Sequence, residues 1–421
     1  MNKKRSPWLW VPSLYYAEGL PYVVVMMVSV IMYKRLGISN TDIALYTSWL
    51  YLPWVIKPLW SPIVDILRTK RYWIIMMQLV IGAGMAGVAF TIPVDNFFQY
   101  TLAFLWLMAF SSATHDIAAD GFYMMGLDKH EQAWYVGFRS TFYRLAMISG
   151  QGLLVILAGS LETSTGNNKL AWSVTFFILA AMFIVFSVYH KFILPKPASD
   201  KTKSIDNLAV FFNEFKETFA LFFKKKRIGL ILSFLLLYRL GEAQLVKLAS
   251  PFLLDEKAAG GLALSTSEVG FIYGTVGIIL LTLGGILGGF IASKDGLKKW
   301  LIPMAVAINL PDMVYIYLAY AQPQSVLIVN ICVAVEQFGY GFGFTAYMLF
   351  MIYISDGEHK TAHFALATGF MALGMMLPGM ISGYLQELMG YKLFFIYVVL
   401  ATIPGFILLP FLQLDKDFGK K

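Results

Sequence analysis

Ionisable side chains interrupt several long apolar stretches of the sequence. They are Glu18 in the first stretch, His115, Asp116 and Asp120 in the fourth, Arg239, Glu242 and Lys247 in the seventh, and Glu336 in the tenth. A charge in hydrocarbon is costly, so such residues normally face a water-filled cavity or an oppositely charged partner. Acids and bases placed in this way can carry protons or bind a charged solute. These residues therefore indicate binding and transfer of solutes rather than covalent chemistry.

The fourth stretch places two carboxylates on one side of a helix. Asp116 and Asp120 are four residues apart, so their side chains share a face. The fifth stretch returns with Arg139 and Arg144, and we expect Arg144 to meet one of the two carboxylates. A proton or substrate relay and a fixed ion pair between two helices both fit this arrangement.

The first and seventh stretches carry their charges at similar depth. Glu18 and Arg239 lie ~15 and ~16 Å along their helices, near the bilayer midplane, where secondary transporters bind their substrates. Arg239 and Glu242 are three residues apart and can pair locally. A substrate that inserts between them would change the protonation of Glu242, whereas an undisturbed pair only neutralises itself. Pro21 weakens the first helix beside Glu18, and Lys57 is either a cavity cation or a residue that snorkels to the interface.

The elements that must position these residues are predicted to be membrane helices. The chain has 421 residues, of which 58% are hydrophobic and 14% charged, whereas a soluble domain has about 25% charged residues. Apolar stretches long enough to cross a bilayer recur. They cover residues 7–33, 43–66, 72–93, 97–125, 137–161, 171–194, 228–254, 268–292, 300–321, 326–354, 364–388 and 391–414. The sequence therefore predicts an all-α polytopic membrane protein with twelve transmembrane helices.

A polar segment divides these stretches into two groups of six. We expect an N-terminal six-helix bundle over residues 1–194, a cytoplasmic linker over 195–227 and a C-terminal six-helix bundle over 228–421, the two bundles being pseudo-repeats. Within the linker, apolar residues recur at helical spacing before a basic run. They are Leu208, Phe211, Phe212, Phe215, Phe219 and Phe222. This pattern fits a helix on the inner membrane face or one packed on the protein itself.

The basic residues are distributed unevenly over the connections. With Met1 in the cytoplasm, 23 of the 33 Lys and Arg residues fall on the cytoplasmic side and five on the opposite side. Cytoplasmic loops carry such an excess, so both termini are predicted to be cytoplasmic. A cleaved signal peptide is not expected, because the first apolar run is long and contains Glu18.

Motifs of other function classes are missing from the sequence. It contains no GxxxxGK[ST] phosphate cradle, no GxSxG and no HExxH, which disfavours an ATP-driven pump or an intramembrane hydrolase. Cys332 is the single cysteine, and His359 and His363 have no third partner nearby in sequence, so neither a disulfide nor a metal site is predicted. We expect no enzyme activity, cofactor, metal or nucleic-acid partner.

Five short motifs follow one another in chain order. They are Gly19-Leu20-Pro21, Lys57 with Leu59-Trp60-Ser61-Pro62 and Asp65, Asp116-Ile117 with Asp120, Tyr143-Arg144-Leu145, and Tyr238-Arg239-Leu240-Gly241-Glu242-Ala243. Together they resemble motifs of the bacterial muropeptide permease family of the major facilitator superfamily and of its acetyl-coenzyme A transporter relatives. The chain departs from that pattern at His115, Ala146 and Glu242, where the family has Gln, Gly and Asp, and these changes leave the particular cargo open.

The resemblance implies inward, proton-coupled transport of cell-wall muropeptides. We expect a monomer in the bacterial inner membrane, and the candidate proton carriers are Glu18, Asp116, Asp120 and Glu242. The candidate substrate contacts are Tyr15, Tyr16, Lys57, His115, Arg144, Tyr238, Arg239 and Glu336, the tyrosines being suited to stacking on sugars. The segment with Asp65, Arg68, Lys70 and Arg71 resembles the superfamily's cytoplasmic gate, in which charge pairs latch one conformation.

Two other functions remain open from the sequence. The first keeps the fold and changes the cargo to another anionic or sugar-containing solute. The second is a membrane sensor that reports cell-wall fragments without moving them. In each case the partners are a small molecule and the lipid bilayer, and a proton-coupled carrier also needs protons.

Overall fold

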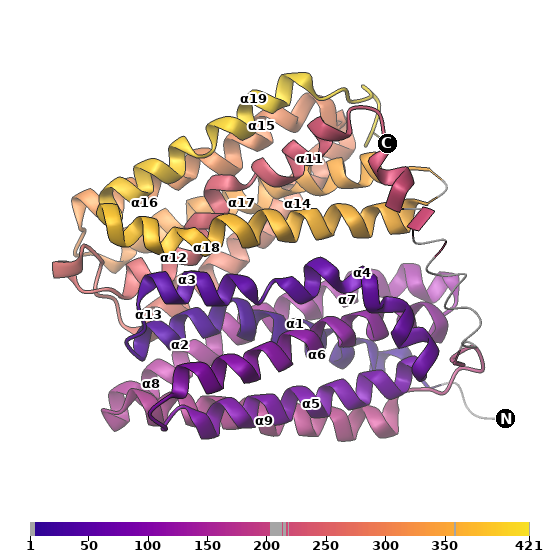
Figure 1. The fold of residues 1–421 in the computed structure, drawn as a ribbon, viewed down its shortest axis with the longest axis horizontal. Helices are drawn as coiled ribbons and strands as arrows, with labels where there is room; N and C mark the ends of the chain where they lie inside the picture. The colour runs from indigo at the N-terminus through magenta and orange to yellow at the C-terminus, as the bar shows by residue number, and fades with distance from the viewer. Residues whose placement is uncertain (1–4, 203–212, 214–215, 218, 358, 421) are drawn as a thin grey trace. The chain divides into compact units, whose positions relative to one another are not determined.

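The computed structural model describes the chain except residues 1–4, 203–212, 214–215, 218, 358 and 421. Every regular element in this described part is a helix (Figure 1), as the all-α prediction requires. The chain forms two compact units. One consists of Met1–Met32 and Ile56–Asn213, and the other of Tyr33–Val55 and Glu214–Lys421. The expected bundle boundaries at residues 194 and 228 stay a prediction.

The first unit contains the helices that carry Glu18 and the two aspartates. Its elements are η1 (Pro7–Leu9), α1 (Val11–Val23), η2 (Val24–Val28), α5 (Lys70–Thr91), α6 (Phe97–Gly126), α7 (Lys129–Met147), η3 (Ile148–Leu154), α8 (Val155–Thr165) and α9 (Asn168–Ile193). Helix α2 (Ser29–Arg35) follows η2, and α4 (Leu52–Leu67) enters this unit from the other one. Helix α5 packs on α6 and α9, and α1 packs on α6 and α7.

Two helices of this unit widen into π-helical turns. Pro21 lies inside α1 and lacks the N–H that continues the helical ladder, and the π-helix η2 follows directly. Helix α7 passes into a second π-helix, η3, which contacts η2. Gly150 of η3 also lies close to the end of α1, because a Cβ there would lie 2.8 Å from Cγ1 of Val23. The predicted weakening beside Glu18 is therefore a local change of helix type.

The second unit is built around α17 and α18. Its elements are α3 (Asn40–Trp49), α11 (Ile228–Leu237), α12 (Leu240–Leu254), η4 (Lys257–Ala259), α13 (Thr266–Val269), η5 (Gly270–Gly277), α14 (Ile278–Asp295), α15 (Leu297–Asn309), η6 (Leu310–Asp312), α16 (Met313–Ala321), α17 (Val326–Ser355), α18 (Lys360–Leu400), α19 (Ile403–Leu408) and η7 (Leu409–Phe411). Helix α17 packs on α14 and α15, and α18 packs on α3 and α12. A Cβ on Gly284 would collide with the Phe338 carbonyl, so this glycine lets α14 and α17 approach closely.

Ten helices in the described residues are long and apolar enough to cross a membrane. Two features account for the difference from twelve predicted spans. Helix α18 continues through Gly390, whose φ of 72° breaks the helical geometry at the expected boundary between two spans. Leu50 and Tyr51 separate α3 from α4, so neither helix is long enough alone. The count of twelve therefore stays a prediction.

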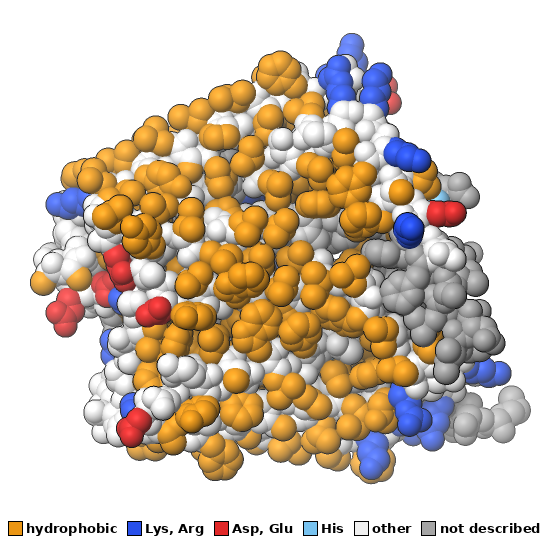
Figure 2. All heavy atoms as spheres, in the orientation of Figure 1, with side chains coloured by type: hydrophobic (Ala, Val, Ile, Leu, Met, Phe, Trp, Pro, Cys, Tyr) orange, Lys and Arg blue, Asp and Glu red, His pale blue; other side chains and the backbone are white. Residues whose placement is uncertain are grey.

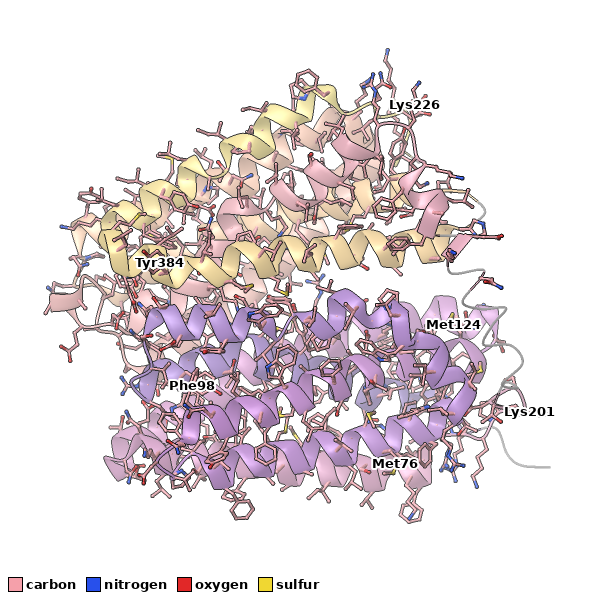
Figure 3. All side chains as sticks on the ribbon, in the orientation of Figure 1. Met76, Phe98, Met124, Lys201, Lys226 and Tyr384 are labelled. Atoms are coloured by element: carbon pink, nitrogen blue, oxygen red, sulfur yellow. The ribbon has the colours of Figure 1, made fainter. Side chains whose placement is uncertain are left out.

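The end of the linker packs on the second unit. Residues 219–223 are helical, and the fully buried Phe222 stacks on Phe370 of α18 and contacts His363. Lys226 extends away from the helices just before α11 (Figure 3). Packing on the protein is thus found at this end, whereas Leu208, Phe211, Phe212 and Phe215 lie outside the described residues.

Large hydrophobic side chains are exposed on the outer helices. Figure 2 shows apolar side chains covering most of the visible helix surface, with Lys, Arg, Asp and Glu gathered mainly near helix ends. Examples are Phe90 on α5, Val185 on α9, Phe290 on α14 and Leu327 on α17, each more than 60% exposed. Contiguous apolar surface of this kind is suited to lipid rather than water.

Candidate functional site

Three carboxylates meet inside the first unit. Glu18 comes from α1, and Asp116 and Asp120 from neighbouring turns of α6. One oxygen atom of each carboxylate lies within 4.8 Å of those of the other two. The predicted common face of Asp116 and Asp120 is therefore directed at α1, which packs on α6.

Two cations neutralise the two aspartates. Lys57 of α4 forms an ion pair with Asp116, so its ammonium group belongs to this cluster. Nη2 of Arg139, on α7, lies 2.6 Å from Oδ1 of Asp120. The Tyr15 hydroxyl donates to the same Asp120 oxygen at 3.2 Å, and the Arg139 guanidinium lies 4.4 Å from the centre of the Tyr15 ring.

No cation in the described part of the chain forms an ion pair with Glu18. Its side chain is 6% exposed, and its Oε2 atom has no hydrogen-bond partner among the described residues. Full ionisation would give the cluster one more negative than positive charge, at a high desolvation cost. The cluster can avoid this cost by holding one proton. It is poorly suited to a divalent metal ion, because Lys57 and Arg139 already neutralise two of its carboxylates.

The expectation that Arg144 meets one of the aspartates is not met. Arg144 has no ion pair within the described part of the chain, and Arg139 takes that place. Depth explains the difference, because α6 and α7 are joined by a short turn and Arg144 lies ~7.5 Å farther along α7 than Arg139. Counted from the turn, Arg139 lies level with Asp116 and about one helical turn from Asp120, whereas Arg144 lies beyond both aspartates.

His115 points away from the carboxylates. Its Nε2 lies 3.0 Å from Nε2 of Gln78 on α5, and Oε1 of Gln78 lies 2.8 Å from Nδ1 of His190 on α9. The Ser13 hydroxyl lies 2.9 Å from Nε2 of His190. These four buried or half-buried side chains join four helices. Tyr16 is also outside the cluster, since it packs on Phe186.

The second unit contains the predicted Arg239–Glu242 pair. Arg239 precedes α12 at the break after α11, and Glu242 lies in the first turn of α12. Nε of Arg239 lies 2.6 Å from Oε2 of Glu242, and Nη2 lies 3.1 Å from Oε1. Nη2 also donates to the Tyr340 hydroxyl at 2.6 Å, and the guanidinium lies 4.9 Å from the centre of the Phe344 ring. The pair is buried and well satisfied.

Other predicted contacts of this unit are separate from that pair. The Tyr238 hydroxyl donates to the Gly343 carbonyl and its ring stacks on Tyr347, so protein atoms occupy the face that was expected to stack on a sugar. Glu336, 1% exposed, accepts hydrogen bonds from the Gln337 amide. Lys247 donates to the Thr47 hydroxyl at 3.0 Å and has no ion pair in the described part.

The predicted gate segment contacts the start of the linker. The backbone N–H groups of Lys70 and Arg71 donate to the Asp200 carboxylate at 2.7 and 3.0 Å. The Arg71 side chain donates to the Leu194 carbonyl, and Arg68 lies over the Tyr72 ring. The Asp65 side chain lies outside the described part.

Comparison with known proteins now identifies the family. The model of the Major Facilitator Superfamily matches residues 16–241. The chain belongs to the Major Facilitator Superfamily. This facilitator is 26% identical to "Putative transporter AmpG 4" of Rickettsia conorii, over 94% of each chain. It is 24% identical to the anhydromuropeptide permease of Escherichia coli K12, over 94% of this chain and 77% of that one.

Solved transporter structures share the facilitator's fold. A bacterial homologue of the human lysosomal transporter Spinster matches with a TM-score of 0.68 and 16% identity, over 98% of this chain and 96% of that one. A D-xylose–proton symporter matches with a TM-score of 0.71 and 13% identity, over 98% of each chain. The protein is therefore a multi-pass membrane transporter similar to muropeptide permeases, and the resemblance stated from the five motifs is confirmed.

Proposed function

We propose that this facilitator is a proton-coupled symporter that carries muropeptides or related cell-wall fragments into the bacterial cytoplasm by alternating access. The observation that carries the proposal is the cluster of three carboxylates with two cations. Such a cluster has a place for one proton, and the similarity to the anhydromuropeptide permease supplies the substrate class. The proposed setting is the inner membrane, with a monomer whose termini are both cytoplasmic.

Glu18 is the proposed proton carrier. Lys57 and Arg139 hold Asp116 and Asp120, which leaves Glu18 as the carboxylate that gains most from a proton. A protonated Glu18 can donate a hydrogen bond to a neighbouring carboxylate. Loss of the proton would add a negative charge and compete for Lys57 and Arg139, so protonation and the positions of α4 and α7 are linked.

Residues 33–55 support alternating access. This segment runs from the end of α2 through α3 to the start of α4, and it belongs to the second unit. Nζ of Lys34 lies 2.5 Å from Oδ1 of Asp255, and the Thr41 hydroxyl donates to Glu387 at 2.6 Å. The Asn40 amide donates to Gln386 at 2.6 Å. Polar contacts of this kind can separate in water, so we propose that they form a gate that opens during transport.

Buried cations support an anionic cargo. Lys247 has no carboxylate partner in the described residues, and it lies 5.3 Å from the centre of the Tyr51 ring. Arg239 shares its charge with Glu242. A carboxylate of a muropeptide would compensate Lys247, and so would another anionic solute. Because His115, Ala146 and Glu242 depart from the family motifs, a different anionic or sugar-containing cargo is the second candidate.

The test is uptake into proteoliposomes driven by an imposed pH gradient, with a panel of labelled cell-wall fragments. Wild-type protein should accumulate at least one fragment against its gradient. Glu18→Gln should lose this accumulation and keep counterflow exchange, since the neutral side chain mimics the protonated form. Glu256→Gln, at an exposed site, is the matched control. Accumulation by Glu18→Gln at the wild-type level would contradict the proposed carrier, and uptake of other solutes alone would contradict the cargo.

A further inference from the structure

A second group of buried acids lies in the second unit, away from the Arg239–Glu242 pair. Asp312 ends the short η6 helix that interrupts the span between α15 and α16. It is 1% exposed, and neither carboxylate oxygen has a hydrogen-bond partner among the described residues. Glu336 is equally buried on α17, and both of its carboxylate oxygens accept hydrogen bonds from the amide of the adjacent Gln337.

The packing of α17 on η6 brings these two acids together. Gly339, almost one turn after Glu336, is pressed against the residue before Asp312, because a Cβ on Gly339 would lie 2.8 Å from Cγ of Pro311. Glu336 is the first acid whose charge acts on Asp312, and Glu242 is the next. Helix breaks at this depth commonly form ion sites in transporters.

Two phenol groups face the same acids. Tyr315 is within electrostatic range of Asp312 and Glu336, and it neighbours Tyr273 of the π-helix η5. Both hydroxyl groups are buried, and that of Tyr315 is placed to hydrogen-bond with Glu336 and with Tyr273. Asp312 is thus the acid with no hydrogen-bond donor among the described residues, and burial makes this unmade bond costly.

No described cation compensates Asp312 or Glu336. Arg239 is committed to Glu242 in a bidentate pair, and the other titratable groups that face the site are Tyr273 on η5, Tyr315 on α16 and Tyr340 on α17. Two ionised carboxylates here would repel each other without compensation.

We propose that Asp312 and Glu336 share an exchangeable proton and form a second proton site, separate from Glu18. The phenol hydroxyls of Tyr273 and Tyr315 hydrogen-bond to the carboxyl groups when the site opens and its proton exchanges. The role of this site in transport rests on the proposed symport. The proton of the site can nevertheless be detected without measuring transport.

The test is infrared difference spectroscopy of the purified full-length protein in detergent, titrated with acid and base. The C=O stretching band of a protonated carboxyl should titrate in the wild type. Asp312→Asn and Glu336→Gln should each remove or shift that band, and the double variant should remove no more than one proton. Tyr315→Phe, which retains both acids, should shift the band, and Glu256→Gln should leave it unchanged.

Several results would overturn the inference. These are a band untouched by both carboxyl variants, a band that persists at every pH at which the protein stays folded, and a proton displaced by Na⁺ but not by K⁺. Glu18→Gln should leave the band in place. If the band titrates but the protein shows no pH-driven uptake, the second proton site is supported and the proposed symport is contradicted.

In proteoliposomes that do show uptake, the reversal potential gives the number of protons carried per substrate. Asp312→Asn should lower this number by one and leave substrate binding intact. An unchanged number together with a titrating band would contradict the role of the site in coupling.

Discussion

Removal of Arg239 should reveal how strongly the second unit depends on one ion pair. The Arg239 and Glu242 side chains are 8% and 1% exposed and are joined by two hydrogen bonds. In the Arg239→Gln variant, Glu242 remains buried but no longer has a positively charged partner. Removing one partner of a buried ion pair costs about 3–5 kcal/mol. We therefore expect the free energy of unfolding to fall by that amount.

A double-mutant cycle measures the interaction energy between Arg239 and Glu242, apart from the contacts that each makes with other residues. Glu242→Gln leaves Arg239 in contact with Tyr340 and Phe344, so its cost should be smaller than that of Arg239→Gln. The double variant Arg239→Gln with Glu242→Gln has no buried charge at this place. We expect it to be more stable than the sum of the single changes predicts, by about 2 kcal/mol or more.

The assay is reversible unfolding of the purified protein in mixed micelles at two pH values. Acid should partly restore the stability of Arg239→Gln, because protonation removes the uncompensated charge of Glu242. Acid should have little effect on the stability of the double variant. Single-variant costs that add within about 0.5 kcal/mol would refute the reasoning and show that the two side chains act independently.

Three further changes test the gate, the packing and the polar network. Lys34→Asp should slow uptake several-fold, because it places two acids together at a pair that is only 16% exposed on each side, and Lys34→Asp with Asp255→Lys should restore it. Failure of the charge swap to restore uptake would contradict a pairwise gate. Gly284→Leu should destabilise the protein by about 1–3 kcal/mol through overpacking of α14 on α17, whereas Gly289→Leu meets open space and should have little effect on thermal unfolding. Gln78→Leu should cost about 1–3 kcal/mol for each buried histidine nitrogen left without a partner, measured by the same unfolding assay, and a neutral effect would show that water replaces the amide.

Local spacing predicted the parts of the site that lie on one helix. Asp116 and Asp120 share a face because they are four residues apart, and Arg239 reaches Glu242 because they are three apart. Both relations depend only on helix geometry. The all-α class and most apolar spans were likewise visible from hydropathy.

Contacts between helices were harder to predict. Arg139 rather than Arg144 meets Asp120 because helix depth and rotation decide which residue faces α6. His115 follows the same rule, since one residue turns the side chain by about 100° from Asp116, toward α5 and α9. The break at Leu50 and the continuation of α18 through Gly390 depend on tertiary packing, which hydropathy does not report.

The paired π-helical turns η2 and η3 are the place where we expect the first unit to bend. Glu18 precedes η2 on α1, and Arg139 precedes η3 on α7, so both lie on the N-terminal side of the widened turns. The turns contact each other, so we expect a bend in one helix to be accompanied by a bend in the other. Such a bend would move the C-terminal ends of both helices, beyond the level at which Glu18 and Arg139 lie.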